Sequence, residues 1–326
     1  MHLIPLVQWV VFGQMPAYPR TAMEFHDWFA REEDCRAYLV GTRWPEGIQC
    51  PRCEARDPWR MKEPFYRCSG CGHDFTVTAG TLFADTHKPL RVWFEAIWHM
   101  TNQKNGVSAL GLQRALGLGS YRTAWNWLHK LRRAMVRPGR DRLAGVVEVD
   151  EAFIGGAEPG KRGRGAAGKS LILVCAQVDG RKIGRIRLAR IADASRKSLG
   201  EAVQQMVESG AEVQTDGWRG YRGLEIAGYR HRIVRESADP DDLLPRVHQV
   251  VSLLKRWLLG THQGASRADH LDYYLDEFTF RFNRRTSRSR GLLFYRLIEQ
   301  AVSLSPVKGK SLVGGHPLAP STTSRD

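Results

Sequence analysis

The sequence predicts a multidomain protein in which a small cysteine-rich module and a helical segment precede a larger α/β domain. Two CxxC pairs lie near the start, three short helical patterns follow them, and strand-like and helical runs then alternate. Its 326 residues and 42% hydrophobic content are enough for a substantial core. We therefore expect a folded chain with more than one domain.

The chain is strongly basic. Lys and Arg number 49 against 34 Asp and Glu, a formal charge of +15, which predicts a polyanionic partner such as double-stranded DNA. The N-terminal run "LIPLVQWVVF" is too short to span a bilayer and lacks the basic start of a signal peptide. We expect no membrane association and a cytoplasmic, nucleoid-associated protein. Met15 is an alternative start to Met1, which would make the first fourteen residues an upstream extension.

Four of the six cysteines form two CxxC pairs with the spacing of a metal site. Cys50 and Cys53 are followed, after fourteen residues, by Cys68 and Cys71. In a cytosolic protein this pattern predicts one tetrahedral, structural Zn²⁺ rather than disulfides. "FYRCSGCGHDFTVT" alternates aromatic and polar residues like the strands of a zinc ribbon. We expect the ribbon over residues 46–85, after an N-terminal extension and a helix, "FHDWFAREEDCRAYL", within residues 1–45.

Residues 87–140 predict a helical DNA-binding segment. Glycine-containing breaks separate "PLRVWFEAIWHMTNQ", "VSALGLQRALGL" and "SYRTAWNWLHKLRRAM", and Ser108 and Ser120 stand at N-cap positions. This is the outline of a helix-turn-helix, whose last helix carries polar and basic side chains for DNA contact: Arg122, Asn126, Lys130, Arg132 and Arg133. A three-helix linker with solvated charges is the alternative, which the neighbouring ribbon and the net charge disfavour.

Residues 143–303 predict the α/β domain, and residues 304–326 a flexible tail. Strands are expected at "GVVEVD", "SLILVCAQVDG" and "KIGRIRLARI", with a hairpin turn at Asp179-Gly180. The helix "SRKSLGEAVQQMVES" and the strands "AEVQTDGW" and "YRHRIVR" follow, and "PRVHQVVSLLKRWLLG" and "RADHLDYYLDEFTFRFNRR" complete the domain as helices. This order predicts a mixed central sheet.

Two acids, Asp150 and Asp216, each close an expected strand. In a ribonuclease-H-like sheet the first and fourth strands are neighbours, so the two carboxylates would meet and bind Mg²⁺ or Mn²⁺. A single strand-end Asp is usually a turn residue, but the pair, beside DNA-binding modules, favours a metal-dependent nuclease. Glu151 would point to the opposite face. Trp218 and Tyr221 beside Asp216 would either stack on a splayed base or pack against the sheet.

Six motifs in order resemble those of the ISXO-type insertion-sequence transposases: "RWPEGIQCPRC", "CSGCGHDFTVTAGT", "VVEVDEAFIGG", "VQTDGWRGY", "VHQVVSLLKRWLLGTHQG" and "YLDEFTFRFNRR". The similarity extends from about Pro19 to Ala301. It implies a zinc ribbon and a DDE-type, ribonuclease-H-like nuclease domain that cleaves DNA at terminal inverted repeats and transfers the freed 3′-hydroxyl to target DNA. It further implies that Asp150 and Asp216 are the first two catalytic acids, and that a homo-oligomer handles two DNA ends together.

The third catalytic position departs from the general DDE pattern, which has a glutamate. Related families are similar but tolerate Asn or His, with a lysine one or two helical turns further on. His248 and Lys255 are seven residues apart on one helical face, so we favour His248 as the metal ligand and Lys255 as a phosphate contact. Glu277 in "YLDEFTF" and the loss of a third ligand are the alternatives.

Other basic clusters are expected to add salt-sensitive affinity for DNA. They comprise Lys161, Arg162 and Arg164 in a glycine-rich loop, and Arg284 and Arg285 at the end of the last expected helix. Two other functions remain open: a non-catalytic zinc-ribbon DNA-binding regulator, and a ribonuclease-H-like nuclease without strand transfer.

Overall fold

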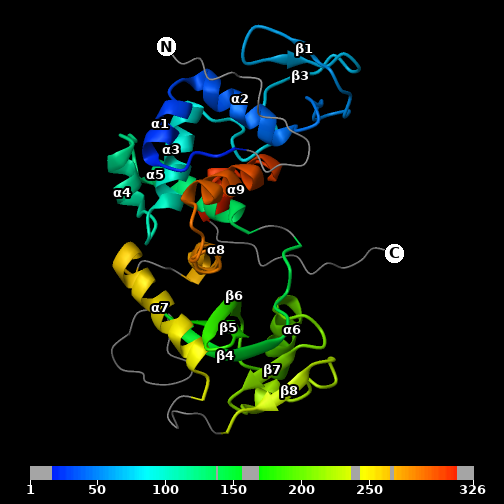
Figure 1. The fold of residues 1–326 in the computed structure, drawn as a ribbon, viewed down its shortest axis with the longest axis vertical. Coiled ribbons are helices and arrows are strands. Elements are labelled where there is room, and N and C mark those ends of the chain that lie inside the picture. Colours follow the sequence, from blue (N-terminus) through cyan, green and yellow to red (C-terminus); the bar gives the residue numbers. More distant parts are fainter. Residues whose placement is uncertain (1–16, 137–138, 156–168, 236–242, 265–267, 314–326) are drawn as a thin grey trace. The chain divides into compact units, whose positions relative to one another are not determined.

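The computed structural model describes residues 17–136, 139–155, 169–235, 243–264 and 268–313 (Figure 1). The chain divides into two compact units, each with its own core, which confirms the multidomain prediction. Unit 1 joins Met1–Met135 with Ser287–Leu312, and unit 2 contains Val136–Thr286. No helix among the described residues is long and apolar enough to cross a membrane.

Unit 1 begins with two short helices, α1 (Ala22–Trp28) and α2 (Glu32–Arg43), where the sequence predicted one. The predicted single helix is interrupted because Asp34 caps a new helix. Its carboxylate accepts hydrogen bonds from the backbone and side chain of Arg31. At the start of α1, the Thr21 hydroxyl accepts a hydrogen bond from the Glu24 N–H.

The zinc ribbon follows α2 as a three-stranded antiparallel sheet in the order β1-β2-β3. Its strands are β1 (Trp59–Arg60), β2 (Tyr66–Arg67) and β3 (Asp74–Phe75). Buried Phe75 stacks on Tyr66 and packs with Cys50, Cys68 and Trp44 in a small core. One face of the ribbon is therefore apolar and covered, while the other faces outward.

Three helices follow the ribbon as predicted: α3 (Leu90–Asn102), α4 (Ala109–Ala115) and α5 (Tyr121–Ala134). The Ser108 and Ser120 hydroxyls accept hydrogen bonds from Gly111 N–H and Thr123 N–H, so both N-cap predictions are confirmed. Trp93 of α3 stacks on Trp127 of α5, with ring centroids 3.7 Å apart. This packing fixes the first and last helices of the helix-turn-helix-like segment together.

The C-terminal helix α9 (Arg290–Ser303) belongs to unit 1 and not, as predicted from the sequence, to the α/β domain. It packs on α3 through Phe294, which contacts Trp98, Phe94 and Phe25. The predicted flexible tail also begins too early, because α10 (Gly309–Val313) follows and buries Leu312. The rest of the predicted tail, 314–326, lies outside the described residues.

Unit 2 is built on a five-stranded mixed sheet in the order β6-β5-β4-β7-β8. The strands are β4 (Val146–Ile154), β5 (Ser170–Asp179), β6 (Lys182–Ile191), β7 (Glu212–Thr215) and β8 (Arg230–Ile233). β4 pairs antiparallel with β5 and parallel with β7. The first and fourth strands are therefore neighbours, as the ribonuclease-H-like prediction required.

Helices cover both faces of this sheet (Figure 1). On one face α7 (Pro245–His262) and α8 (Leu271–Phe282) bury apolar residues of β5 and β6. On the other face α6 (Arg196–Met206) packs on the odd-numbered residues of β4, Val147 and Val149. Along β4, odd-numbered side chains therefore face α6 and even-numbered side chains face α7.

Candidate active site and zinc centre

Asp150 lies within β4 rather than at its end, because the strand continues to Ile154. It shares the even-numbered face with Glu148, the face that α7 covers. Backbone pairing with Val174 of β5 holds this part of the strand in register. The prediction of a strand-end acid was therefore wrong in detail, and a rigid strand interior positions the carboxylate.

Asp216 directly follows β7, as predicted. The parallel register pairs Val146 with Glu212 and Glu148 with Gln214, so extending it by one more step of two residues brings Asp150 level with Asp216. The exposed Asp216 carboxylate accepts a hydrogen bond from the Trp218 N–H at 2.9 Å, which fixes it in a turn. Two acids thus lie level with each other on neighbouring parallel strands.

The surroundings of Asp150 raise its pKa to about 6. Burial is the main cause, and the negative charges of Glu151 and Asp216 add to it. A hydrogen bond from the Glu151 N–H and the nearby His248 act in the opposite direction. Clustered acids that disfavour one another's charge are typical of a site for a divalent cation, which relieves the repulsion.

His248, on the first turns of α7, faces Asp150 across the site. Its Nε2 lies 3.3 Å from Asp150 Oδ2, and its side chain is 47% exposed. Lys255 is exposed two turns further along the same helix. The structure therefore places His248, the third ligand favoured from the sequence, next to Asp150, although the two residues are 98 positions apart.

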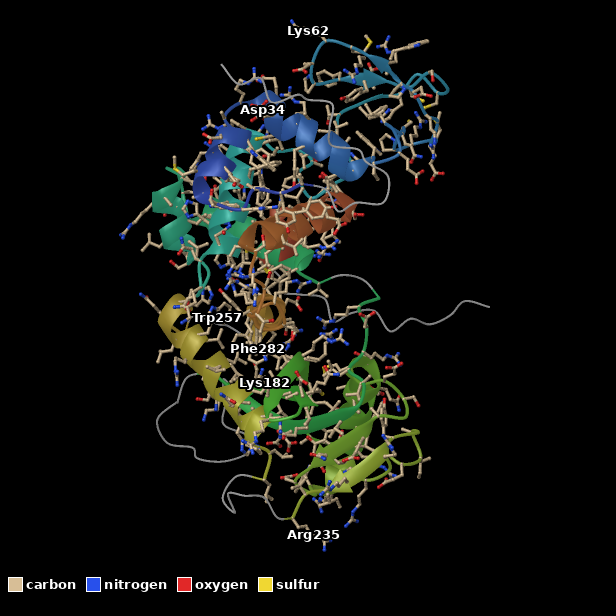
Figure 2. The ribbon with its side chains drawn as sticks, viewed as in Figure 1. Asp34, Lys62, Lys182, Arg235, Trp257 and Phe282 are labelled. Carbon is tan, nitrogen blue, oxygen red and sulfur yellow. The ribbon has the colours of Figure 1, made fainter. Side chains whose placement is uncertain are left out.

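Glu148, which sequence reasoning missed, anchors α7 beside Asp150. Only 2% of its side chain is exposed, and its carboxylate accepts hydrogen bonds from the N–H groups of Arg246 (2.8 Å) and Val247 (3.1 Å). The Arg246 guanidinium donates to the same carboxylate at 2.7 Å and to the carbonyls of Gly180 and Lys182, the latter labelled in Figure 2. A buried anion at a helix N-terminus with an arginine partner fixes where α7 begins.

The signal for Glu148 was present in "VVEVD". An acid between two valines on a core strand, on the same face as Asp150, requires a buried partner. That partner came from the start of α7, about 100 positions away in the chain. No local pattern reveals such a pairing.

Glu151 lies on the opposite face of β4 from Asp150, as alternation predicted. Its Oε2 accepts a hydrogen bond from the hydroxyl of Tyr221 at 2.7 Å. Tyr221 is 1% exposed and packs in the α6 core, so of the two alternatives open from the sequence the structure favours packing over stacking on a DNA base. Trp218 is half-buried and its Nε1 donates to the Ala194 carbonyl.

Glu277, the alternative third ligand, is fully buried on α8. Its carboxylate forms an ion pair with Arg281 of the same helix at 2.8 Å. A carboxylate that is paired and inaccessible to water is a poor candidate for binding a metal ion and a DNA phosphate together. The geometry therefore favours His248 over Glu277.

Asp150, Asp216 and His248 offer two carboxylates and an imidazole, a donor set that fits Mg²⁺ or Mn²⁺. Their arrangement is open: within the described part of the chain, three or more ligand atoms lie within 4.8 Å of one another only at the four cysteines. Two-metal nuclease sites hold ions about 3.5–4 Å apart, so their donors are spread more widely than those of one tetrahedral ion. A wider spread of donors than at one tetrahedral ion is therefore compatible with a two-metal site.

The four predicted zinc ligands, Cys50, Cys53, Cys68 and Cys71, come together in the ribbon. Sulfur separations of 3.8 Å (Cys50 to Cys71) and 3.5 Å (Cys53 to Cys68) match the edge of about 3.8 Å expected for a tetrahedron with Zn–S bonds of about 2.3 Å. Hydrogen bonds from the Cys71 and Gly70 N–H groups lower the pKa of Cys68. The donor set and geometry fit a structural Zn²⁺.

The two cysteine pairs have matching backbone turns. Glu54 N–H donates to the Cys50 carbonyl, and Gly72 N–H donates to the Cys68 carbonyl in the same way. Both turn residues have positive φ, 60° and 68°. The turns aim each pair of sulfurs toward one point, which the CxxC spacing alone predicted.

The predicted DNA contacts on α5 differ in accessibility. Arg122 is exposed, and Asn126 and Arg133 are half-buried. Lys130 is half-buried with its ammonium 6.0 Å from the centre of the Trp93 ring. Arg132 is only 1% exposed and lies beside buried His129, so its predicted contact with DNA is wrong. Arg122 is the best placed of the five to reach a phosphate.

Two other basic clusters were also predicted to contact DNA. Lys161, Arg162 and Arg164 lie outside the described residues. Arg285 donates to the carbonyls of Gly184 and Ile183 and thereby covers the edge of β6, which leaves its guanidinium engaged by the protein. Arg284 is half-buried, donates to the Phe280 carbonyl and lies over the Phe280 ring. Both arginines stabilise unit 2 through these contacts.

Comparison with known proteins agrees with the geometry. Residues 142–283 match the ISXO2-like transposase domain, and residues 30–74 match the transposase zinc-ribbon domain. Together the two matched regions cover more than half of the chain, and both models describe transposase domains. A protein of Halobacterium salinarum, described as an uncharacterized protein in transposable element ISH50, is 28% identical over 276 residues, which cover 78% of this chain and 91% of that protein. The matched transposase domain contains Asp150, Asp216 and His248.

Proposed function

We propose that this transposase binds the terminal inverted repeats of its element, cleaves DNA there, and joins the freed 3′-hydroxyl to target DNA. The proposal is supported by His248 lying 3.3 Å from Asp150 and by Asp216 lying near enough for its charge to raise the pKa of Asp150, in a domain that matches a transposase family. Nothing in such a site requires a nucleophilic side chain, because water and a DNA hydroxyl supply the nucleophiles.

We propose that Asp150 and Asp216 hold Mg²⁺ or Mn²⁺, with His248 as the third ligand. Bound divalent cations would activate the attacking oxygen and stabilise the leaving one. In the first step water attacks phosphorus, and the bond to the 3′-oxygen breaks to leave a 3′-hydroxyl and a 5′-phosphate. In the second, that hydroxyl loses its proton and attacks a target phosphodiester, whose own 3′-oxygen leaves and takes up a proton. The number of phosphodiester bonds is conserved in this second step.

The remaining residues bind and position DNA in this proposal. Exposed Lys255, two turns along α7 from His248, contacts a phosphate near the cut, and exposed Arg122 contacts the duplex through α5. We further propose that the transposase works in the cytoplasm on nucleoid DNA. A homo-oligomer holds two element ends together, since transposition needs both.

A labelled duplex that carries the terminal repeat, incubated with Mg²⁺ or Mn²⁺, tests the proposal. Cut ends followed by joined products support a transposase. Binding without metal-dependent cutting contradicts the proposal and supports the zinc-ribbon regulator. Cutting of branched or hybrid substrates without joined products supports a ribonuclease-H-like nuclease instead.

His248→Ala addresses the third ligand separately. We expect a loss of cutting of about 10²-fold, the range for removing a group that supports a metal site, with binding to the duplex unchanged. Glu277→Gln is the comparison, because it tests the competing ligand. If Glu277→Gln folds normally and loses cutting while His248→Ala retains it, the assignment of the third ligand is wrong.

A further inference from the structure

The outer face of the ribbon carries an exposed apolar cluster. Trp59, Met61 and Phe65 are 62%, 42% and 50% exposed. Trp59 pairs with Arg67 across the β1–β2 hairpin, and the Met61 N–H donates to the Phe65 carbonyl, so alternation places the three side chains on one face. The other face bears Tyr66 and is covered by the ribbon core. We call Trp59, Met61 and Phe65 the ribbon patch.

Elsewhere in the described residues, large exposed apolar side chains are scattered over separate elements: Met23, Leu110, Tyr121, Ile226, Ile233 and Leu259. The ribbon patch instead gathers two aromatic rings and a methionine within seven residues. Taking aromatic side chains at about 150–250 Å², it exposes on the order of 300 Å². Apolar patches of this size on soluble proteins commonly mark an interaction site.

The charge around the ribbon patch argues against a DNA phosphate backbone as its partner. Residues 46–85 contain five Lys and Arg against six Asp and Glu, a net charge of −1, while the rest of the chain carries +16. Arg67, level with Trp59, is neutralised by a two-pronged contact with Asp74 at 2.7 and 2.8 Å. Phosphate binding depends on cations that are available to displace counterions.

The ribbon patch is held in a fixed position. Glu63, at the hairpin tip next to Lys62 (labelled in Figure 2), forms an ion pair with Arg36 of α2 at 2.6 Å. The zinc centre and the stacked rings of Tyr66 and Phe75 support the strands from behind. A pre-ordered surface loses little conformational entropy when a partner binds.

We propose that the ribbon patch is a self-association surface, on which the ribbons of two copies of this chain dock face to face. Two copies with +16 outside their ribbons repel each other, and the ribbon is a part of the chain where they can approach at little electrostatic cost. Trp, Phe and Met are enriched in the cores of protein interfaces, and one apolar patch is self-complementary under two-fold symmetry. This assigns a surface to the proposed homo-oligomer and does not depend on the nuclease chemistry.

The patch is smaller than the roughly 800 Å² per partner of a stable complex, so the contact is weak, with a Kd in the micromolar range or above. Sedimentation velocity of the zinc-loaded full chain without DNA, from about 1 to 100 µM, measures it. We expect a concentration-dependent dimer, and we expect Trp59→Ser/Phe65→Ser to weaken dimerisation at least tenfold. Ile226→Ser, which removes an 87% exposed side chain of unit 2, is the control and should dimerise like the unmodified chain.

Zinc content, measured by native mass spectrometry, shows whether the double variant keeps a folded ribbon. If the double variant loses zinc, a second experiment tests the proposal: a photo-crosslinking amino acid replaces Met61 in the otherwise unmodified chain. We then expect crosslinks between the ribbons of two copies. A monomer throughout the concentration range, a zinc-loaded double variant that dimerises normally, or crosslinks outside residues 46–85 would overturn the proposal. Weaker binding to the terminal repeat with unchanged dimerisation would assign the patch to DNA instead.

Discussion

Glu148→Gln tests how the start of α7 is coupled to the active site. The substitution keeps the shape of the side chain but removes the charge, and it places an amide NH₂ where donors now point. Glu148 accepts hydrogen bonds from the N–H groups of Arg246 and Val247 and from the Arg246 guanidinium. At least one of these contacts must break or turn repulsive, and Arg246 loses its buried anionic partner.

The magnitude follows from the burial of the pair. Removing one member of a buried ion pair costs about 3–5 kcal/mol. Because the Arg246 side chain is 23% exposed, water recovers part of that cost, and we expect unit 2 to lose about 2–3 kcal/mol of unfolding free energy. Urea unfolding followed by a spectroscopic probe of unit 2 measures it.

Glu148→Gln should also displace His248, which lies on the first turns of α7 and 3.3 Å from Asp150. A misplacement of about 1 Å at a reacting centre costs on the order of 10²-fold in rate. We expect metal-dependent cutting to fall by about 10- to 100-fold at a temperature where the variant is still folded. Glu148 is thus a positioning residue, and higher metal concentration should restore part of the lost rate.

Glu212→Gln is the matched control, since Glu212 lies in the same sheet but its arginine partner, Arg232, is 3.9 Å away and largely exposed. We expect its stability to stay within about 0.5 kcal/mol of the unmodified chain. If Glu148→Gln unfolds and cuts like the unmodified chain, the coupling between Glu148 and the active site is refuted.

Further predictions concern pH dependence, zinc binding and the salt dependence of DNA binding. Because burial and neighbouring acids raise the pKa of Asp150 to about 6, protons compete with metal: cutting at limiting Mg²⁺ should fall as pH drops below about 6, and excess Mg²⁺ should move the midpoint lower. In the metal-free chain the same shift makes stability decrease as pH rises from about 4 to 6, because the folded state binds the proton more tightly there; urea unfolding against pH checks the sign. Cys53→Ser should abolish zinc binding, measured by metal analysis, whereas Cys35→Ala, away from the zinc ligands, should keep it; zinc bound by Cys53→Ser at full stoichiometry would disprove the four-cysteine site. Arg122→Ala should lower the salt dependence of DNA binding by about one unit of slope, while buried Arg132→Met should leave the slope unchanged and lower thermal stability; equal slopes for Arg122→Ala and the unmodified chain would exclude that contact.

Local patterns predicted most of the architecture. The CxxC turns, the serine N-caps and the apolar strands each depend on residues close together in the sequence, so they could be read without knowledge of the fold. The strand order of a ribonuclease-H-like sheet then predicted that the strands of Asp150 and Asp216 are neighbours. The structure agrees on each of these points.

The errors had different causes, one of them a local cap and another a contact between distant segments. Asp34 starts a second helix at Arg31 through a side-chain contact that the apolar periodicity of the segment concealed. The helix α9 packs through Phe294 on α3, about 200 positions earlier in the chain, rather than on its neighbours in sequence. Arg132 carries a charge typical of a DNA-binding helix, but its helical position faces the core. Side-chain type alone did not distinguish these environments.

In the candidate site, too, local patterns identified some residues and missed another. Asp150 and Asp216 were identified from strand context, and His248 from its spacing to Lys255 and the resemblance to a family. Glu148 was overlooked because its partners, Arg246 and Val247, are about 100 positions away. The residues proposed to touch DNA or metal left local signals, whereas Glu148, which holds the start of α7 in place, is revealed by its tertiary contacts.

The most direct test of the central claim is the rate of metal-dependent cutting at the terminal repeat by Asp150→Asn, measured beside DNA binding by the same protein. Asn keeps the size of the side chain and removes the charge that would bind Mg²⁺. We predict that Asp150→Asn binds the repeat normally, remains folded, and cuts at least 10³-fold more slowly than the unmodified chain. Cutting at an unchanged rate would contradict the assignment of this site as the nuclease centre.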